Sequence, residues 1–146
     1  MMIAPQEPKS KRSTVASEVD KRRVRATPAD QRVVAMGVGT SVDTVVEQAH
    51  EVRPDVVAVA DEAATAGLVE RLPPGTTLLV GVDAMAEAAV VSDVAINGVV
   101  GFAGLSVTMA ALEAGKRLGL ANKESLIAAG PVVQRAWATP GAELSP

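Results

Sequence analysis

The segment that most constrains the fold lies between residues 94 and 121, where two short apolar runs flank a helical pattern. Apolar side chains between the two runs recur at the spacing of one helix face. A strand, a helix and a second strand in this order predict two parallel strands joined by a right-handed crossover. The two runs are Val94–Ile96 and Leu118–Ala121, and the helical positions between them are Leu105, Met109 and Leu112.

The same alternation of strand and helix patterns runs through most of the chain. Because the connections are short and the strands alternate with helices, the sequence predicts an α/β fold, a Rossmann-like doubly wound parallel sheet of about five strands. Pro131 is expected to kink or divide a helix that begins near Lys123, and Leu144 begins a further strand. The other expected strands are 32–36, 55–60 and 76–80, and the other expected helices are 42–52, 61–72 and 83–91.

The composition limits how such a domain can be built. A chain of 146 residues supports one domain. Phe102 and Trp137 are its only aromatic residues, so the core is expected to consist of aliphatic side chains. There is no cysteine, which excludes disulfides and thiolate metal sites. No apolar run is long enough for a membrane helix, and we expect a cytoplasmic protein that does not bind membranes.

Charge divides the chain into two parts. Residues 1–32 hold eight Lys/Arg against four Asp/Glu, a net charge of +4, whereas the remainder holds six against thirteen, a net charge of −7. We expect residues 1–31, which are rich in Pro, Ser and basic residues, to form a disordered leader, and residues 32–146 to form the domain. An acidic domain with almost no aromatic residues argues against nucleic-acid binding.

The expected strand 32–36 ends in the sequence Gly37-Val38-Gly39-Thr40-Ser41. Glycines let a ligand approach the backbone, and helix amides with the hydroxyls of Thr40 and Ser41 can hold a phosphate. The same residues also form ordinary turns, with Thr40 or Ser41 capping the next helix. The loop alone does not decide between the two interpretations.

A second polar cluster, Asn122-Lys123-Glu124, follows the expected strand 118–121. The carboxyl end of a parallel strand is where such sheets bind ligands. A solvated first turn of a helix, with Asn122 as its cap, explains the same residues equally well. His50 is the only histidine and is expected on a solvated helix face, and Asp61-Glu62 is expected to begin a helix without forming a metal site.

Residues 97–130, NGVVGFAGLSVTMAALEAGKRLGLANKESLIAAG, resemble the central signature of 1-deoxy-D-xylulose 5-phosphate reductoisomerases. These are NADPH-dependent enzymes of the non-mevalonate isoprenoid pathway that form 2-C-methyl-D-erythritol 4-phosphate with the help of a divalent metal, Mg or Mn. The resemblance extends over about 32–146. It implies that Gly39, Thr40 and Ser41 bind the 2′-phosphate end of NADPH, although the family usually has a basic residue and Asn at the last two positions. It also implies that Asn122 and Glu124 contact NADPH and that Lys123 contacts the phosphosugar substrate.

The resemblance also implies parts that this sequence does not contain. The family's glycine-rich pyrophosphate loop, similar to GSTGSIG, is not found before Arg32, and the family's acidic metal-binding motif would follow Pro146. We therefore expect a partial NAD(P)-binding domain, a fragment with neither metal ligands nor catalytic residues and with no turnover by itself.

Two alternatives remain open at this point. The chain could be a non-catalytic α/β module that binds a nucleotide or a protein partner. If the first strand of the sheet is missing, the strands beside it are left unpaired, and this exposed edge could bind the partner or a second copy of the chain. It could also be a different NAD(P)-linked dehydrogenase domain, which the lack of a second glycine-rich loop disfavours.

Overall fold

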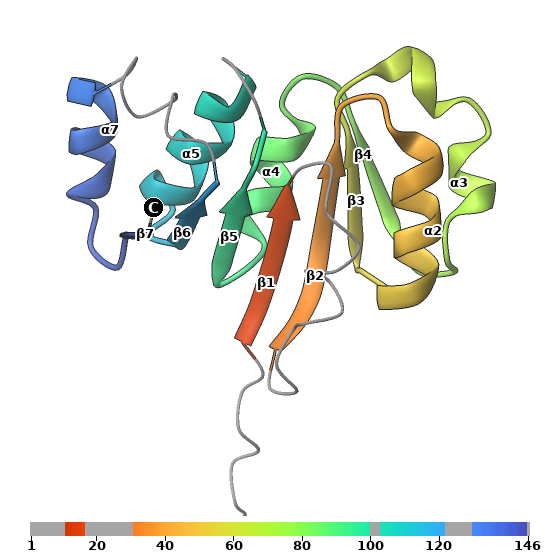
Figure 1. Cartoon of the computed structure of the whole chain (residues 1–146), viewed down its shortest axis with the longest axis horizontal. Helices are drawn as coiled ribbons and strands as arrows, with labels where there is room; N and C mark the ends of the chain where they lie inside the picture. The colour runs from red at the N-terminus through yellow and green to blue at the C-terminus, as the bar shows by residue number, and fades with distance from the viewer. Residues whose placement is uncertain (1–10, 17–30, 100–102, 122–129, 146) are drawn as a thin grey trace, which may run out of the picture.

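The computed structural model describes residues 11–16, 31–99, 103–121 and 130–145, which form one parallel sheet with helices on both faces (Figure 1). The sheet has seven strands in the order β4-β3-β2-β1-β5-β6-β7, and every neighbouring pair is parallel. The strands are β1 (Lys11–Ala16), β2 (Gln31–Val38), β3 (Val56–Val59), β4 (Thr77–Val80), β5 (Val94–Asn97), β6 (Arg117–Leu120) and β7 (Glu143–Ser145).

The helices occupy most of the segments expected from the sequence pattern. They are α2 (Val42–Val52), the 3-10 helix η1 (Glu62–Thr65), α3 (Leu68–Arg71), α4 (Ala84–Val90), α5 (Ala103–Glu113) and α7 (Gly130–Trp137). The single helix expected over 61–72 is wrong, because Gly67 adopts a left-handed conformation with φ of 65° and separates η1 from α3. Pro131 lies in the first turn of α7, where proline needs no intrahelical amide.

The strand β1 overturns part of the expected leader. Residues 11–16 lie in the middle of the sheet, where Ser13 pairs with Val33 of β2 and with Val94 of β5. The sequence of β1, KRSTVA, carries too few apolar residues to predict a buried strand, and its place is set by two neighbours that each offer an unpaired edge. The unpaired sheet edge on which the alternative of a binding module rested is thus occupied by β1, and the sheet has seven strands where about five were expected.

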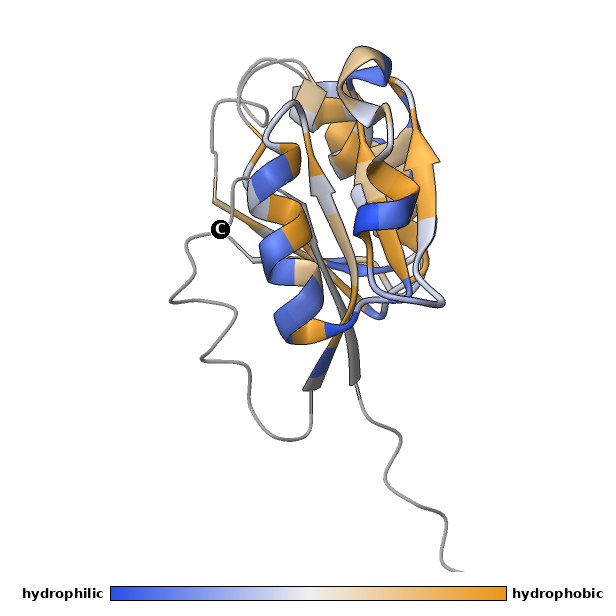
Figure 2. Cartoon of the chain, turned by 90° about the vertical axis from the view of Figure 1, so that its right-hand side faces the viewer, coloured by the Kyte–Doolittle hydropathy of each residue, from blue (hydrophilic) through white to orange (hydrophobic). Residues whose placement is uncertain are grey.

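Alternate residues of the strands face two separate hydrophobic clusters, one on each side of the sheet. On β3, Val57 and Val59 face the cluster formed with α2 and α3, whereas Ala58 faces the cluster formed with α4, α5 and α7. The alternation places α2 and α3 on one face and α4, α5 and α7 on the other, which confirms the doubly wound α/β fold. In the view of Figure 2 the helices turn hydrophilic residues outward and hydrophobic residues toward the sheet.

Both clusters consist of aliphatic side chains, as the composition predicts. The largest fully buried side chains include Met36, Leu68, Leu112 and Leu118. The small residues of the strands let the helices approach closely: a Cβ on Gly37 would lie 3.0 Å from Cγ of Met85 on α4. Within the described part of the chain, no helix has the length and hydrophobicity that crossing a membrane requires.

Candidate functional site

The carboxyl ends of all strands meet at one edge of the sheet because all strand pairs are parallel. The direction of winding reverses at this edge: β1 to β4 follow one another toward one side, and β5 to β7 lie on the other side of β1. In open parallel sheets, ligands bind in the crevice at such a reversal point. The loops after β2, β3, β4, β5 and β6 therefore define the candidate site.

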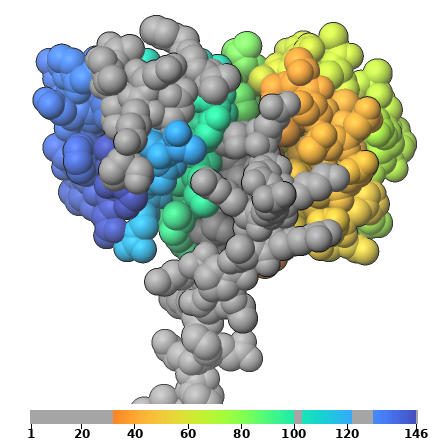
Figure 3. All heavy atoms as spheres, viewed as in Figure 1, coloured from red at the N-terminus to blue at the C-terminus, as the bar shows by residue number. Residues whose placement is uncertain are grey.

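The loop between β2 and α2 holds three of the residues singled out from the sequence. Gly39 and Thr40 are exposed, and a Cβ built on Gly39 would meet no atom within 4 Å, so open space lies beside the backbone there. Ser41 is the N-cap residue of α2, but its side chain forms no capping hydrogen bond to the helix. The loop thus places Ser41 at the start of α2, as the ordinary turn interpretation expects, and it also leaves space for a ligand beside Gly39, so both interpretations stay open. Figure 3 shows the orange atoms of the β2–α2 region at the upper edge of the molecule.

The loops after β3 and β4 adjoin this loop. The amide of Asp61 donates to the carbonyl of Gly39 at 3.2 Å, and the amide of Gly81 donates to Val59 at 3.0 Å. Asp61 begins η1, as expected, and its Oδ1 accepts a hydrogen bond from the amide of Ala63 at 3.0 Å. Glu62 Oε1 lies 3.4 Å from the position that a Cβ on Gly81 would occupy. Two carboxylates thus lie at the site edge, and the strand-end rule that selected Asn122 would also have selected them.

Asn97, the last residue of β5, anchors the neighbouring loop. Its side chain is buried, and Nδ2 donates to the carbonyl of Gly104 at 2.6 Å and to Oγ1 of Thr108 at 3.0 Å. Its Oδ1 accepts a hydrogen bond from the amide of Val99 at 3.0 Å. The side chain therefore holds the start of the β5–α5 loop against α5. The sequence-based list of site residues did not include it.

Asn122, Lys123 and Glu124, the strongest candidates from the sequence, lie outside the described residues. The described chain reaches Ala121, whose amide donates to the carbonyl of Asn97 at 3.0 Å. This hydrogen bond joins the ends of β5 and β6 directly before the cluster. Ala121, the residue before the cluster, thus lies at the same edge of the sheet as Gly39. The roles of Asn122, Lys123 and Glu124 stay predictions.

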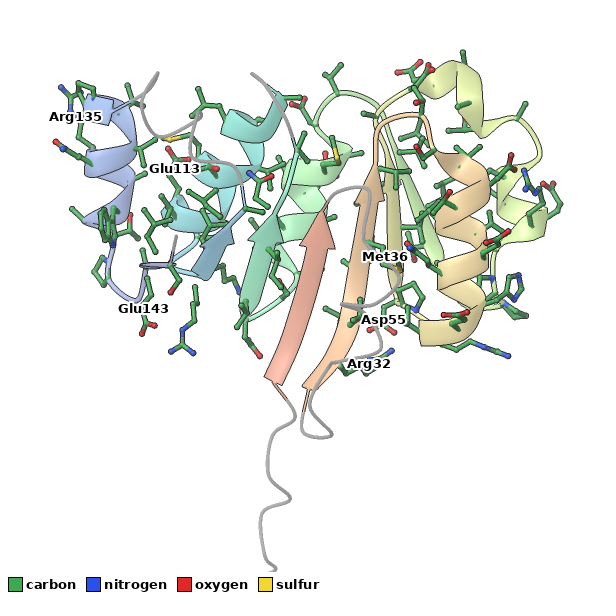
Figure 4. All side chains as sticks on the ribbon, in the orientation of Figure 1. Arg32, Met36, Asp55, Glu113, Arg135 and Glu143 are labelled. Atoms are coloured by element: carbon green, nitrogen blue, oxygen red, sulfur yellow. The ribbon has the colours of Figure 1, made fainter. Side chains whose placement is uncertain are left out.

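The opposite edge of the sheet carries the ion pairs of the strands. Arg32 at the start of β2 donates to Asp55, and Arg117 at the start of β6 donates to Glu143 of β7. Figure 4 shows Arg32, Asp55 and Glu143 at this amino-terminal edge. The hydrogen bond from Arg117, with its positive charge, lowers the pKa of Glu143, and the hydrogen bond to Asp55 raises the pKa of Arg32.

The acidic and histidine side chains of the described residues do not assemble a metal centre. No group of three or more His, Asp or Glu residues there has a geometry that could hold an ion. His50 lies on the exposed side of α2, and its Nε2 is 2.9 Å from the carbonyl of Arg71. The ring thus contacts the end of α3 and not the loops at the carboxyl ends of the strands.

Comparison with known proteins assigns the family. The pattern of the family described as 1-deoxy-D-xylulose 5-phosphate reductoisomerase matches residues 22–130. The chain is 40% identical over 130 residues to the reductoisomerase of Prochlorococcus marinus strain NATL2A, which covers 82% of this chain and 32% of that protein. It is 44% identical over 128 residues to that of Synechococcus sp. strain CC9605, covering 82% of this chain and 31% of the relative. The chain therefore spans about a third of the length of these relatives.

Solved structures of the same enzyme share the fold. The reductoisomerase from Zymomonas mobilis in complex with NADPH matches with a TM-score of 0.85 and 28% identity, covering 93% of this chain and 38% of that one. A DOX-P reductoisomerase in complex with NADPH, fosmidomycin and magnesium matches with a TM-score of 0.81 and 29% identity, covering 92% of this chain and 35% of that one. Both comparisons agree with the resemblance found in residues 97–130, and the chain belongs to the 1-deoxy-D-xylulose 5-phosphate reductoisomerase family.

Proposed function

We propose that this chain forms the cofactor-binding part of a 1-deoxy-D-xylulose 5-phosphate reductoisomerase and binds a nicotinamide dinucleotide across the carboxyl edge of its sheet. The observation that carries the proposal is the loop at Gly39, which is open to a ligand and lies beside the reversal point of a doubly wound sheet. Two family structures are complexes with NADPH, and two, one of which also holds NADPH, are complexes with the small molecule fosmidomycin and magnesium.

The residues present fit the body of a dinucleotide. Gly39 leaves room for a ribose or a phosphate against the backbone, and the first turn of α2 offers amides without intrahelical acceptors. Thr40 and Ser41 add hydroxyl groups that can donate to or accept from ribose oxygens. These three residues are proposed to hold the adenosine end of the cofactor.

The remaining roles follow the family resemblance. Asn122 and Glu124 are proposed to bind the cofactor, and Lys123 to neutralise the anionic phosphosugar substrate, since an ammonium is a compact positive charge. Asn97 is proposed to position the β5–α5 loop between these groups. A bound nicotinamide would supply the hydride for reduction of the substrate. A divalent metal is a feature of the family structures, and no residue of this chain is assigned to it.

The proposal is tested by titrating NADPH and NADH into the purified chain while the thermal unfolding midpoint is measured. A ligand at 100 times its dissociation constant stabilises the folded state by about 2.7 kcal/mol. Gly39→Val should leave the unliganded midpoint unchanged, because the added side chain enters open space, and should abolish the ligand-induced rise. Ala138→Val adds similar bulk at an exposed position after α7 and serves as the control.

Two results would contradict the proposal. Absence of any rise with either dinucleotide at millimolar concentration would remove the cofactor site, and an undiminished rise in Gly39→Val would place the site elsewhere. The expectation that the 146 residues alone do not turn over the phosphosugar stays a prediction, and substrate-dependent oxidation of NADPH by the purified chain with Mg²⁺ present would refute it. The cytoplasmic location, the possible homodimer and the lack of nucleic-acid binding also stay predictions.

A further inference from the structure

We propose that β4, the strand at one end of the sheet, pairs antiparallel with β4 of a second copy of this chain and joins two sheets into one. The proposal concerns the lateral edge of the sheet and does not depend on the proposed cofactor site. It rests on the backbone groups that this edge leaves unpaired, on the neutral sequence of β4 and on a register that satisfies both copies.

β4 has a hydrogen-bonded neighbour on one side only. Among the described strands it pairs with β3 alone. The amides of Thr77 and Gly81 donate to carbonyls of β3 and of the residue before it, at 2.8 Å and 3.0 Å. Because successive residues of a strand direct their backbone groups to opposite sides, the amides and carbonyls of Leu78 and Val80 face away from β3. Such a row of donors and acceptors is the kind of edge to which another strand adds.

This edge lacks the side chains that usually block the addition of a strand. Residues 75–82, GTTLLVGV, contain no charged residue and no proline, although 21% of the whole chain is charged. Val80 is 43% exposed and Val82 is 81% exposed, so two apolar side chains lie in solvent here. Leu78 and Leu79 pack against the two hydrophobic clusters, one on each face, and hold the strand in place.

The neutral sequence of β4 points to a second copy as the partner. A strand that pairs with its own copy across a two-fold axis brings identical side chains close together, so a charged residue would meet a like charge. β4 is free of this repulsion. At the opposite end of the sheet, β7 is only three residues long and carries Glu143, which pairs with Arg117. β4 is therefore better suited to self-pairing than β7.

One register satisfies both the hydrogen bonds and the two faces of the sheet. With Leu79 opposite Leu79 of the second copy, Leu78 lies opposite Val80, and the groups that face away from β3 form hydrogen-bonded pairs. The side chains of Leu78 and Val80 share one face, because side chains alternate along a strand. A two-fold axis perpendicular to the sheet keeps that face continuous across the pair. Gly81, with a φ of 112°, ends the regular strand.

The pairing is expected to be weak. β4 contributes four residues from each copy. Stable interfaces between proteins bury at least roughly 1,200 Å² in total, and a pair of strands of this length buries less. We therefore expect a transient dimer with a dissociation constant on the order of 100 μM.

Sedimentation velocity of the purified chain between about 10 μM and about 1 mM should show a monomer that gives way to a dimer as the concentration rises. Val80→Lys places a charge on the edge strand and should raise the dissociation constant at least about tenfold. Val132→Lys makes the same change at an exposed valine of α7 and should leave dimerisation unchanged. Circular dichroism shows whether both variants fold.

Introduced cysteines test the register, because the chain has no cysteine of its own. Residues opposite each other in a non-hydrogen-bonded pair have Cα atoms about 4.5 Å apart, which a disulfide can bridge. Leu79→Cys should therefore form a disulfide-linked dimer on mild oxidation. Leu78→Cys makes the same change one residue away, where the two cysteines are offset along the strands beyond the reach of a disulfide, and should stay unlinked.

Hydrogen exchange in the unaltered chain gives a test that needs no variant. Raising the protein concentration should slow exchange at the amides of Leu78 and Val80, whereas the amides of Thr77 and Gly81, which already donate to the β3 side, should keep their rates.

Three results would each overturn the proposal. The first is a monomer throughout the concentration range. The second is a dimer that a folded Val80→Lys variant forms as readily as the unaltered chain. The third is slowed exchange in β7, either alone or together with β4, which would indicate a different pairing of the sheet edges.

Discussion

At the scale of single residues, Gly115 illustrates how closely the end of α5 approaches the loop before β7. Its φ is 66°, and a Cβ there would lie 2.7 Å from the carbonyl oxygen of Pro140. Gly67 has a similar φ of 65° but open space around the position of a Cβ. The two glycines share the same backbone conformation and differ in their surroundings.

Gly115→Ala should therefore destabilise the protein more than Gly67→Ala. The left-handed conformation costs both variants about 1 kcal/mol, and the contact with Pro140 adds about 1–3 kcal/mol in Gly115→Ala only. Urea unfolding of the two variants measures the difference in the free energy of unfolding. Equal losses would show that the chain at Pro140 moves away without cost.

Asn97 gives a second prediction at this scale. Asn97→Ala removes both hydrogen bonds of the side-chain amide group and the acceptor for the amide of Val99 within a buried site, so the free energy of unfolding should fall by about 2–4 kcal/mol. Thr108→Val removes a single partner at similar volume and should cost about 1 kcal/mol. A smaller loss in Asn97→Ala than in Thr108→Val would contradict the anchoring role.

The ion pair of Glu143 predicts a small dependence of stability on pH. Arg117 lowers the pKa of Glu143 in the folded state, so the pair stabilises the protein above the ordinary glutamate pKa, and this stabilisation disappears as the pH falls through the lowered value. Both side chains are about half exposed, so the effect is small. An NMR titration should give a pKa for Glu143 below that of glutamate in an unfolded peptide, and the difference should vanish in Arg117→Gln.

At the scale of elements, β1 is the feature that the sequence did not predict. From Ser13 to Ala16 the strand has a neighbour on both sides, so each amide in this stretch faces either β2 or β5. Thr14→Pro removes one such donor and should destabilise the domain by about 3 kcal/mol or more. Thr14→Ala changes the same side chain but keeps the amide, so the difference between the two variants, measured by thermal unfolding, isolates the backbone contribution.

The strands and helices that could be predicted share a strong local pattern. The helix expected over 42–52 matches α2, because valines recur on one face and Pro54 follows its end. β1 lacks such a pattern, and its partners lie far away in the sequence. The break at Gly67 was missed for a related reason, since one glycine in a helical pattern does not reveal that the backbone will adopt a positive φ.

The sequence predicted only those parts of the candidate site that have a local sequence pattern. Gly39, Thr40 and Ser41 were found because glycines directly follow an apolar strand. Asp61 and Glu62 were interpreted only as a helix start, because their position beside Gly39 depends on the pairing of β2 with β3. The position of these two residues beside the loop at Gly39 is thus a property of the strand pairing, which local patterns do not contain.

At the scale of the whole molecule, β1 and α4 join the two halves of the sheet. β1 lies between β2 and β5, and α4 contacts β1, β2, β3 and β4 on one side and α5 on the other. The two sides of the candidate site belong to different halves, with Gly39 on one and Asn97 on the other. The relative position of the two site loops therefore depends on β1, although no side chain of that strand is assigned to the site.

The central position of β1 also affects how the chain reaches its native state. This strand is synthesised well before one of its partners, β5, which begins at Val94, opposite Ser13 and 81 positions later. Contacts between residues so distant in sequence slow the folding of small proteins, because a long loop must close before they form. A ribosome must therefore add 81 residues after Ser13 before β1 can be enclosed on both sides.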